Sequence, residues 1–262
     1  MNYVQRGSGT PVILIHGLAA SFHDWDDLIP ELASNGYAGY ALDLLGHGDS
    51  PKLESRTYQP DWLFEHFCSW MRSLRLTEPA ILIGHSLGGY LALEYARRVS
   101  AWTRGLVLVN PFYSRAQLPL LVRKTYNRTN ISELVISKVP EKWFRFFVDV
   151  SSAAIGHSVG SLRSLPERVR EQTLLDYKRT APGVYHIPSA ISDLTDHLPG
   201  INTPSLVLWG DRDRTLAPSS FLRLVKELPK ARGEILHAGH VPHQSQAPVF
   251  NRIVLDFLNE LK

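Results

Sequence analysis

The 262-residue sequence has little cysteine and no long apolar run, and both absences narrow the setting in which the protein works. Its single cysteine, Cys68, cannot form a disulfide within the chain, so a reducing compartment is compatible with it. No apolar stretch approaches the roughly 20 residues that a membrane-spanning helix requires. The ten residues before the first apolar run, Pro11–Ile15, show neither a charged leader region nor a cleavage site. We therefore expect a cytoplasmic protein with no membrane partner.

Runs of one charge sign are also missing. The 28 basic and 25 acidic residues give a formal charge of +3, and no segment is rich in Lys and Arg, so nucleic-acid binding has no support. Because neither a metal-binding cluster nor the glycine pattern of a dinucleotide site is visible, no cofactor and no metal are expected. The apolar share of 44% and charged share of 20% are typical of an ordinary globular protein with a sizeable core.

Short apolar segments alternate with helical segments through the first 110 residues. The predicted strands are 12–15, 37–43, 80–84 and 105–109, and the predicted helices are 24–34, 61–75 and 87–99. These strands are nearly continuously apolar, which is typical of strands covered on both faces, as in a parallel sheet. The alternation indicates right-handed βαβ crossovers and therefore an α/β fold with a doubly wound, mostly parallel sheet.

This alternation is interrupted after Pro111 and returns near residue 204. Residues 112–199 are helical in character without a convincing buried strand, and their best helical windows are Leu118–Asn127, Ser132–Val139, Glu141–Val150 and Pro166–Thr180. The later predicted elements are a strand at 204–209, a helix at 218–228, a strand at 233–237 and a helix at 248–261. We predict a core domain formed by 1–111 and 200–262, with 112–199 inserted as a helical cap or lid.

Residues 84–89 contain the most informative motif of the chain. They read Gly-His-Ser-Leu-Gly-Gly and lie between the apolar run Ala80–Ile83 and a helix-compatible segment. A strand, a Gly-x-Ser-x-Gly turn and a helix form the layout of a nucleophile elbow, in which Ser86 is the nucleophile. Such a sharp turn holds the serine in a strained, positive-φ conformation. Bulky neighbours would collide there, which explains the flanking glycines.

A serine nucleophile requires a base to take its proton and an acid to orient that base. On this architecture the acid and then the histidine follow the serine along the chain, in loops at the carboxyl ends of late strands. The loop after the strand at 204–209 offers Asp211 and Asp213 as the acid. The segment after the last strand offers three histidines as the base: His237, His240 and His243.

With these motifs in this order, the sequence resembles the α/β-hydrolase superfamily over essentially its whole length, with the cap matched least. The acid loop of that family reads Gly-x-x-Asp, which selects Asp213, and its Gly-His pair near the carboxyl end selects His240. The resemblance thus implies a triad of Ser86, Asp213 and His240, and a cap inserted after the sixth strand of the family.

Two backbone N–H groups are expected to bind the developing oxyanion. One belongs to Leu87, the residue after the nucleophile, at the positive end of the following helix. The resemblance places the other in the loop after the first predicted strand, His16-Gly17-Leu18-Ala19, at Leu18.

Serine at the elbow indicates acyl transfer, because the epoxide hydrolases and haloalkane dehalogenases of this superfamily use aspartate there. We predict a serine hydrolase that cleaves carboxylic esters of small to medium apolar substrates through an acyl-enzyme. The same triad also serves lactonases, thioesterases and carbon–carbon bond hydrolases of the meta-cleavage type. A ligand receptor of this fold with slow turnover is the alternative from another class. The expected partner is a small-molecule ester, and the oligomeric state is left open.

Aromatic residues of the predicted cap are candidates for the substrate pocket. Trp143, Phe144 and Phe147 lie on one predicted helix, and Trp25 follows the oxyanion loop. They either form an apolar wall above Ser86 or pack the cap and the core, and the sequence leaves both interpretations open.

Overall fold

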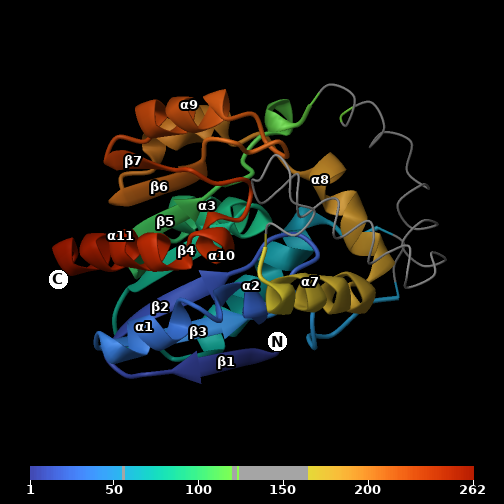
Figure 1. The fold of residues 1–262 in the computed structure, drawn as a ribbon, viewed down its shortest axis with the longest axis horizontal. Helices are drawn as coiled ribbons and strands as arrows, with labels where there is room; N and C mark the ends of the chain where they lie inside the picture. Colours follow the sequence, from blue (N-terminus) through green and yellow to red (C-terminus); the bar gives the residue numbers. More distant parts are fainter. Residues whose placement is uncertain (55–56, 120–122, 124–164) are drawn as a thin grey trace.

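A seven-stranded sheet forms the centre of the protein, in the strand order β1-β3-β2-β4-β5-β6-β7 (Figure 1). The computed structural model describes residues 1–54, 57–119, 123 and 165–262. β1 runs antiparallel to β3, and the other neighbouring strands are parallel. The strands are β1 (Tyr3–Arg6), β2 (Thr10–Ile15), β3 (Tyr37–Leu42), β4 (Ala80–His85), β5 (Thr103–Val109), β6 (Ser205–Gly210) and β7 (Ala231–Leu236).

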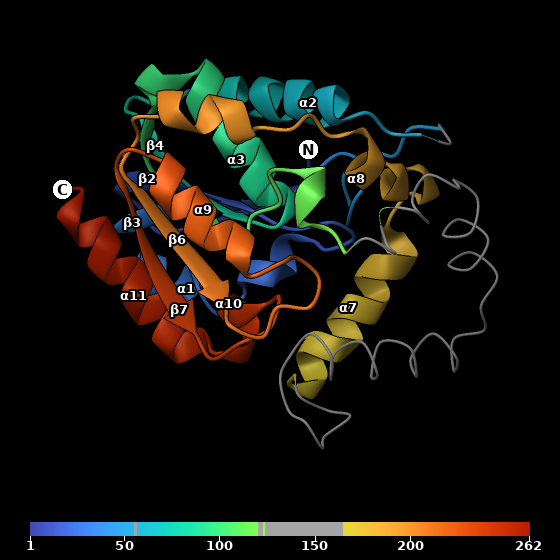
Figure 2. The same ribbon diagram turned by 90° about the horizontal axis from the view of Figure 1, so that it is seen from above.

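Helices cover both faces of this sheet (Figure 2). One face carries α2 (Pro60–Ser73), α3 (Leu87–Arg98) and α9 (Ser219–Glu227), and the other carries α1 (Ile29–Ser34) and α11 (Ala247–Glu260). Short helical turns complete the core: η1 (Phe22–Trp25), η2 (Ser100–Trp102) and α10 (Pro242–Ser245).

The two covered faces explain why the strands are continuously apolar. In β2, Ile13 and Ile15 belong to the core beneath α2 and α3, whereas Val12 and Leu14 belong to the core beneath α1 and α11. Successive side chains of a strand point to opposite faces, so a strand buried on both sides has no polar positions. The prediction of a doubly wound, mostly parallel sheet is confirmed.

Two local predictions differ from the structure. The segment predicted as one helix at 24–34 is divided into η1 and α1, because Pro30 lies in the first turn of α1, where its ring suits only a helix start. β1 was not predicted, since it is an edge strand whose side chains are largely exposed and which therefore lacks an apolar run.

The chain between β5 and β6 carries η3 (Arg115–Gln117), α7 (Glu167–Arg179), η4 (Pro182–His186), α8 (Ile187–Ala190) and η5 (Thr195–Gly200). α7 matches the predicted helical window Pro166–Thr180 and lies beside the loop after β2, where Ser21 Oγ donates to Asp176 Oδ2 at 2.9 Å. Trp143, Phe144 and Phe147 lie outside the described residues. The division into a core and a cap stays a prediction.

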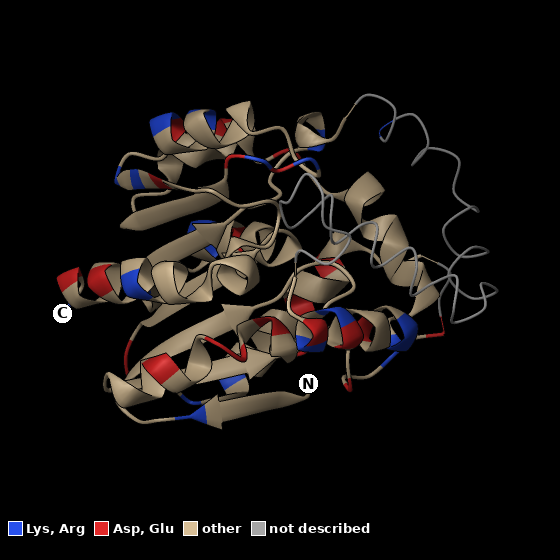
Figure 3. Cartoon of the chain, in the orientation of Figure 1, with Lys and Arg blue, Asp and Glu red and all other residues tan. Residues whose placement is uncertain are grey.

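Charged side chains of both signs are interspersed on the described surface. Figure 3 shows Lys and Arg next to Asp and Glu along α7 and α11. Among the helices that the structure describes, none combines the length and the apolar character that crossing a bilayer requires.

Candidate active site

Ser86 lies at the turn between β4 and α3, with the expected positive φ of +49°. Two backbone hydrogen bonds hold the turn against the next strand. The Ser86 N–H donates to the carbonyl oxygen of Val109, and the Phe112 N–H donates to the carbonyl oxygen of Ser86, both at 3.0 Å. A non-glycine residue in this conformation is strained, so the surrounding backbone must enforce it.

The glycines of the elbow are required by close backbone approaches. A Cβ atom on Gly84 would lie 2.3 Å from the carbonyl oxygen of Gly88, and one on Gly88 would lie 2.1 Å from that of Ile15. Neither contact is tolerable, so a side chain at either position would force β2, β4 and α3 apart.

We expect Gly88→Ala to lower the free energy of unfolding by roughly 1–3 kcal/mol or more, because its methyl group collides with backbone. Urea unfolding followed by circular dichroism measures this loss. Gly200→Ala is the matched control, since a Cβ there meets nothing within 4 Å and should change stability by less than about 0.5 kcal/mol. Equal stability of the two variants would contradict the close packing of the elbow.

Asp213 and His240 form a buried pair at the carboxyl ends of β6 and β7. His240 Nδ1 lies 2.8 Å from Asp213 Oδ2, and the two side chains are 10% and 0% exposed. An ionised carboxylate only accepts hydrogen bonds, so His240 Nδ1 carries a proton and donates a hydrogen bond to Asp213. The other ring nitrogen, Nε2, is then unprotonated in the neutral ring and can act as the base.

The environment of Asp213 keeps its carboxyl group ionised. Burial alone would raise its pKa, but His240, the backbone N–H of Leu216 and Asn110 outweigh that effect and lower the pKa below its ordinary value. Leu216 N–H donates to Oδ1 at 3.0 Å and Asn110 Nδ2 donates to Oδ2 at 2.7 Å. A carboxylate with several donors is stabilised in its charged form.

The other candidate acid and bases occupy different places. Asp211 Oδ2 pairs with His237 Nδ1 at 2.8 Å, but this pair is on the surface, with side chains 40% and 63% exposed. His243 is buried, and its ring packs 4.9 Å from the ring of Trp25, centroid to centroid. The structure therefore separates two Asp–His pairs, one buried and one exposed.

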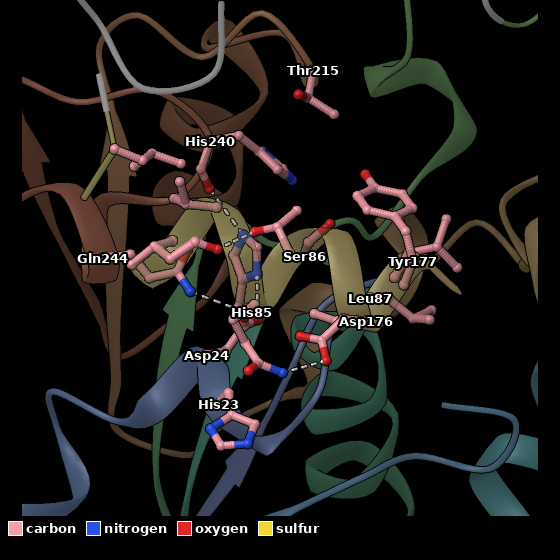
Figure 4. A pocket seen from close by; sticks show the side chains of 18 of the residues that line it. His23, Asp24, His85, Ser86, Leu87, Asp176, Tyr177, Thr215, His240 and Gln244 are labelled. Carbon is pink, nitrogen blue, oxygen red and sulfur yellow. Dashed lines mark hydrogen bonds and ion pairs between the residues drawn. The ribbon is translucent and has the colours of Figure 1, made fainter. Parts of the chain in front are cut away.

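A cavity of about 540 Å³ brings the predicted catalytic groups together. Ser86, Leu87, His240 and Leu18 all line it, and Figure 4 shows Ser86 and His240 in this cavity. Much of the remaining described wall is apolar and includes Phe112, Leu165, Val169, Tyr185, Pro188 and Leu216.

Trp25 does not belong to this wall. Its side chain is fully buried in the core beneath α1 and α11, and it is absent from the described lining of the cavity. The interpretation of Trp25 as a pocket residue is therefore corrected: η1 turns its apolar side toward the sheet, and Trp25 fills the core there.

Each candidate oxyanion donor is next in the chain to a residue with strained, positive-φ backbone. Leu87 is the first residue of α3, where an N–H has no acceptor within the helix. Leu18 precedes Ala19, whose φ is +57°. Of the four described non-glycine residues with positive φ, three follow β2, β4 and β5 at the site: Ala19, Ser86 and Asn110. Strained backbone of this kind gathers at functional sites.

Buried polar groups brace the loops beneath the site. His16 Nε2 accepts from the Leu44 N–H at 2.9 Å. Asp43 accepts from the backbone N–H of Phe22 at 2.8 Å and from that of Asp49 at 2.9 Å. Asp43 begins the tight turn that reads Asp-Leu-Leu-Gly-His-Gly-Asp-Ser, and it supports the neighbouring loops rather than facing the cavity.

Sequence reasoning missed Asn110, Asp24 and Asp176 as residues of the site. Asn110 donates a hydrogen bond to Asp213, the predicted acid, and its signal was available, since it is a polar residue directly after a buried strand. Asp24 and Asp176 both line the cavity. Asp176 comes from α7, far away in the sequence, and nothing local marks it.

Asp176 is a carboxyl group with an unusually high pKa. Burial raises its pKa to about 7, although Gln172 and Ser21 donate hydrogen bonds to it. The nearby charge of Asp24 also raises the pKa, and His23 lowers it. At neutral pH the carboxyl group is therefore partly protonated.

We expect Asp176→Asn to stabilise the protein at pH 8 but not at pH 4. The carboxyl group has its ordinary pKa of 3.8 in the unfolded chain and a pKa of about 7 in the folded protein. Between pH 3.8 and pH 7 the folded protein therefore holds more protons, so the free energy of unfolding of the wild type falls as pH rises. The difference reaches up to about 4 kcal/mol above pH 7, and denaturant unfolding across this range measures it. A constant difference between variant and wild type at all pH values would contradict the shift.

The comparisons with known proteins agree with this architecture. A family model described as the alpha/beta hydrolase fold matches residues 10–245. A pimeloyl-[acyl-carrier protein] methyl ester esterase of Aeromonas hydrophila subsp. hydrophila is 26% identical, with 96% of each chain covered. An esterase from Thermogutta terrifontis has a TM-score of 0.83 at 22% identity, covering 99% of this chain and 93% of that one. A bromoperoxidase from Bacillus anthracis has a TM-score of 0.84 at 20% identity, covering 98% and 94%.

The family model spans nearly the whole chain, from β2 to α10, and so includes the elbow, the buried acid–histidine pair and the loops between them. The chain belongs to the alpha/beta hydrolase family.

Proposed function

We propose that this protein is a carboxylic ester hydrolase in which Ser86 attacks the ester carbonyl. One observation carries the proposal: the buried Asp213–His240 pair, at 2.8 Å, presents His240 to the cavity that Ser86 also lines. A base that is oriented by a buried carboxylate and shares a cavity with a half-buried serine is the arrangement required for activating a hydroxyl group.

In the proposed reaction, Ser86 Oγ bonds to the carbonyl carbon while its proton passes to His240 Nε2. The Leu87 and Leu18 N–H groups bind the negative oxygen of the tetrahedral intermediate. The intermediate collapses when the ester C–O bond breaks, and the departing alcohol takes the proton from His240. Water then attacks the acyl-enzyme by the same route in reverse, releasing the acid and restoring Ser86. Asp213 stabilises the imidazolium in both halves.

The shape and polarity of the cavity support small to medium esters as substrates. A volume of about 540 Å³ lies within the range for pockets that enclose a small molecule. The apolar part of the wall favours an apolar acyl or alcohol group, since burying such groups is favourable. A methyl ester is also the substrate type that the name of the Aeromonas relative states.

A panel of p-nitrophenyl esters of increasing acyl length tests the proposal, combined with labelling by a fluorophosphonate probe. We expect turnover with a maximum at short to medium acyl chains and a single labelled residue, Ser86. Parallel assays with a lactone, a thioester and a vinylogous diketone identify the rival chemistries. If the protein showed neither turnover nor labelling, yet a ligand still raised its melting temperature, the proposal would be wrong and a ligand receptor would be favoured.

A further inference from the structure

A second cluster of chemically active side chains lies behind the nucleophile. Asp24 comes from η1, His85 from the elbow and His243 from α10. One ligand atom from each, namely a carboxylate oxygen and two ring nitrogens, lies within 4.8 Å of the others. The side chains of these residues are only 8%, 6% and 1% exposed. Three segments that are separate in the sequence thus meet at one buried point.

The histidines of this cluster have ring nitrogens without hydrogen-bond partners. His85 Nε2 lies 2.9 Å from the carbonyl oxygen of His240, which only accepts, so Nε2 carries the proton. His85 Nδ1 lies 3.4 Å from Asp24 Oδ2 yet forms no hydrogen bond with it. Neither ring nitrogen of His243 forms a hydrogen bond, although Nε2 lies 3.9 Å from Asp24 Oδ2. Buried polar atoms left in this way cost free energy, so each requires an explanation such as a bound ion.

The surroundings hold the cluster in a fixed orientation. Gln244 Nε2 donates to Asp24 Oδ1 at 3.2 Å, and the Gly17 N–H donates to Asp24 Oδ2 at 3.3 Å. Figure 4 shows the His85 ring between the backbone of His240 and the carboxylate of Asp24. Metal-binding histidines are typically oriented in this way, with the second ring nitrogen donating to a backbone carbonyl.

Gly17 leaves space beside the free nitrogen of His85. A Cβ atom at position 17 would lie 2.8 Å from His85 Nδ1 and 3.4 Å from Ser86 Cβ. Any other residue there would narrow the space in front of this nitrogen, so glycine keeps that position open.

We propose that Asp24 Oδ2, His85 Nδ1 and His243 Nε2 bind a divalent transition-metal ion, with zinc as the first candidate. Two imidazoles and one carboxylate are a common ligand set for such ions. Bonds of about 2.0–2.1 Å in a tetrahedral site space the ligand atoms roughly 3.4 Å apart. His85 Nδ1 and His243 Nε2 lie 3.4 and 3.9 Å from Asp24 Oδ2, and one ligand atom of each residue lies within 4.8 Å of the others, so binding draws these atoms closer by up to roughly 1.4 Å. Asp24 and His85 also line the cavity, which leaves the fourth position accessible to water.

The ion would act by positioning the catalytic segments. It joins the loop that follows the candidate oxyanion donor, the elbow that carries Ser86 and the helix that follows His240. Because the binding free energy of the metal adds to the folded state alone, the ion should raise the melting temperature.

Metal binding to the full-length, tag-free protein tests this proposal. After treatment with a chelator, the protein is titrated with Zn²⁺ by calorimetry and with Co²⁺ by visible spectroscopy. We expect one ion to bind per chain and Zn²⁺ to raise the melting temperature. The Co²⁺ spectrum should be typical of a four-coordinate ion with nitrogen and oxygen ligands. His243→Gln and Asp24→Asn should each weaken Zn²⁺ binding by at least roughly 10-fold.

His237→Gln is the matched control, because it breaks the exposed Asp211–His237 pair without touching the buried cluster. It should bind Zn²⁺ as tightly as wild type. Circular dichroism confirms folding, and Asp24→Asn serves as the near-isosteric variant if His243→Gln does not fold. If the wild-type protein bound Zn²⁺ no more tightly than Asp24→Asn, the proposal would be overturned. The three side chains would then be held together by a shared proton instead of a metal ion. Since the readout is metal binding, it is independent of whether the protein hydrolyses esters.

Discussion

Ser86→Ala is expected to reduce kcat for the best ester of the panel by roughly 10⁴- to 10⁶-fold and to abolish labelling by the fluorophosphonate probe. The reason is that, in the proposed mechanism, the hydroxyl group forms the acyl-enzyme bond, and the methyl group of alanine cannot take its place. The residual rate comes from the oxyanion donors and from substrate binding. Steady-state kinetics and mass spectrometry of the labelled protein measure both effects.

Ser34→Ala provides the control for this variant. The Ser34 hydroxyl is exposed at the end of α1 and donates only to the Pro30 carbonyl oxygen within its own helix. We expect full turnover and full labelling of Ser86 in this variant. Full turnover by Ser86→Ala would show that the proposed nucleophile is wrong.

Asp213→Asn is expected to lower kcat by about 10⁴-fold. An asparagine side chain keeps the shape, but its amide group is neutral and can donate to Nδ1, so His240 adopts the tautomer that carries its proton on Nε2. The ring then cannot take the proton of Ser86, and no carboxylate stabilises the imidazolium. The KM should change little, because Asp213 is not among the described residues that line the cavity.

Asp211→Asn is the matched control for the acid. Asp211 lies two residues before Asp213 in the chain and pairs with His237 on the surface. Its side-chain hydrogen bonds reach none of the described residues that line the cavity. We expect its kcat to stay within about two-fold of wild type, in line with the small effects of most surface substitutions. If Asp211→Asn lost activity while Asp213→Asn kept it, the exposed pair would be the catalytic one.

Much of the fold could be predicted because local patterns encode it. The central residues of β4 and β5, 80–83 and 106–109, form continuous apolar runs, since helices cover both faces of the sheet, and this leaves a direct signal in the sequence. The elbow is predictable for a similar reason: its backbone approaches are so close that only glycine fits at positions 84 and 88. β1 escaped prediction because its hydrogen bonds, rather than buried side chains, hold it at the edge of the sheet.

The choice between the two aspartates shows where local patterns end. From the residues alone both Asp211 and Asp213 were open, and family spacing favoured the second. The structure adds that Asp213 is buried with His240, whereas Asp211 is exposed with His237. The exposure of a loop residue depends on what packs over it, and this is not written in the neighbouring sequence.

The sequence by itself determined the alternation of strands and helices and the strained serine turn, because each depends on residues close together in the chain. Only the tertiary structure decided which Asp–His pair is buried, that Trp25 belongs to the core, and that Asp176 faces the cavity from α7. It also brought Asp24, His85 and His243 to one point. These contacts join segments up to 219 positions apart, so they arise only when the sheet and its helices are packed together.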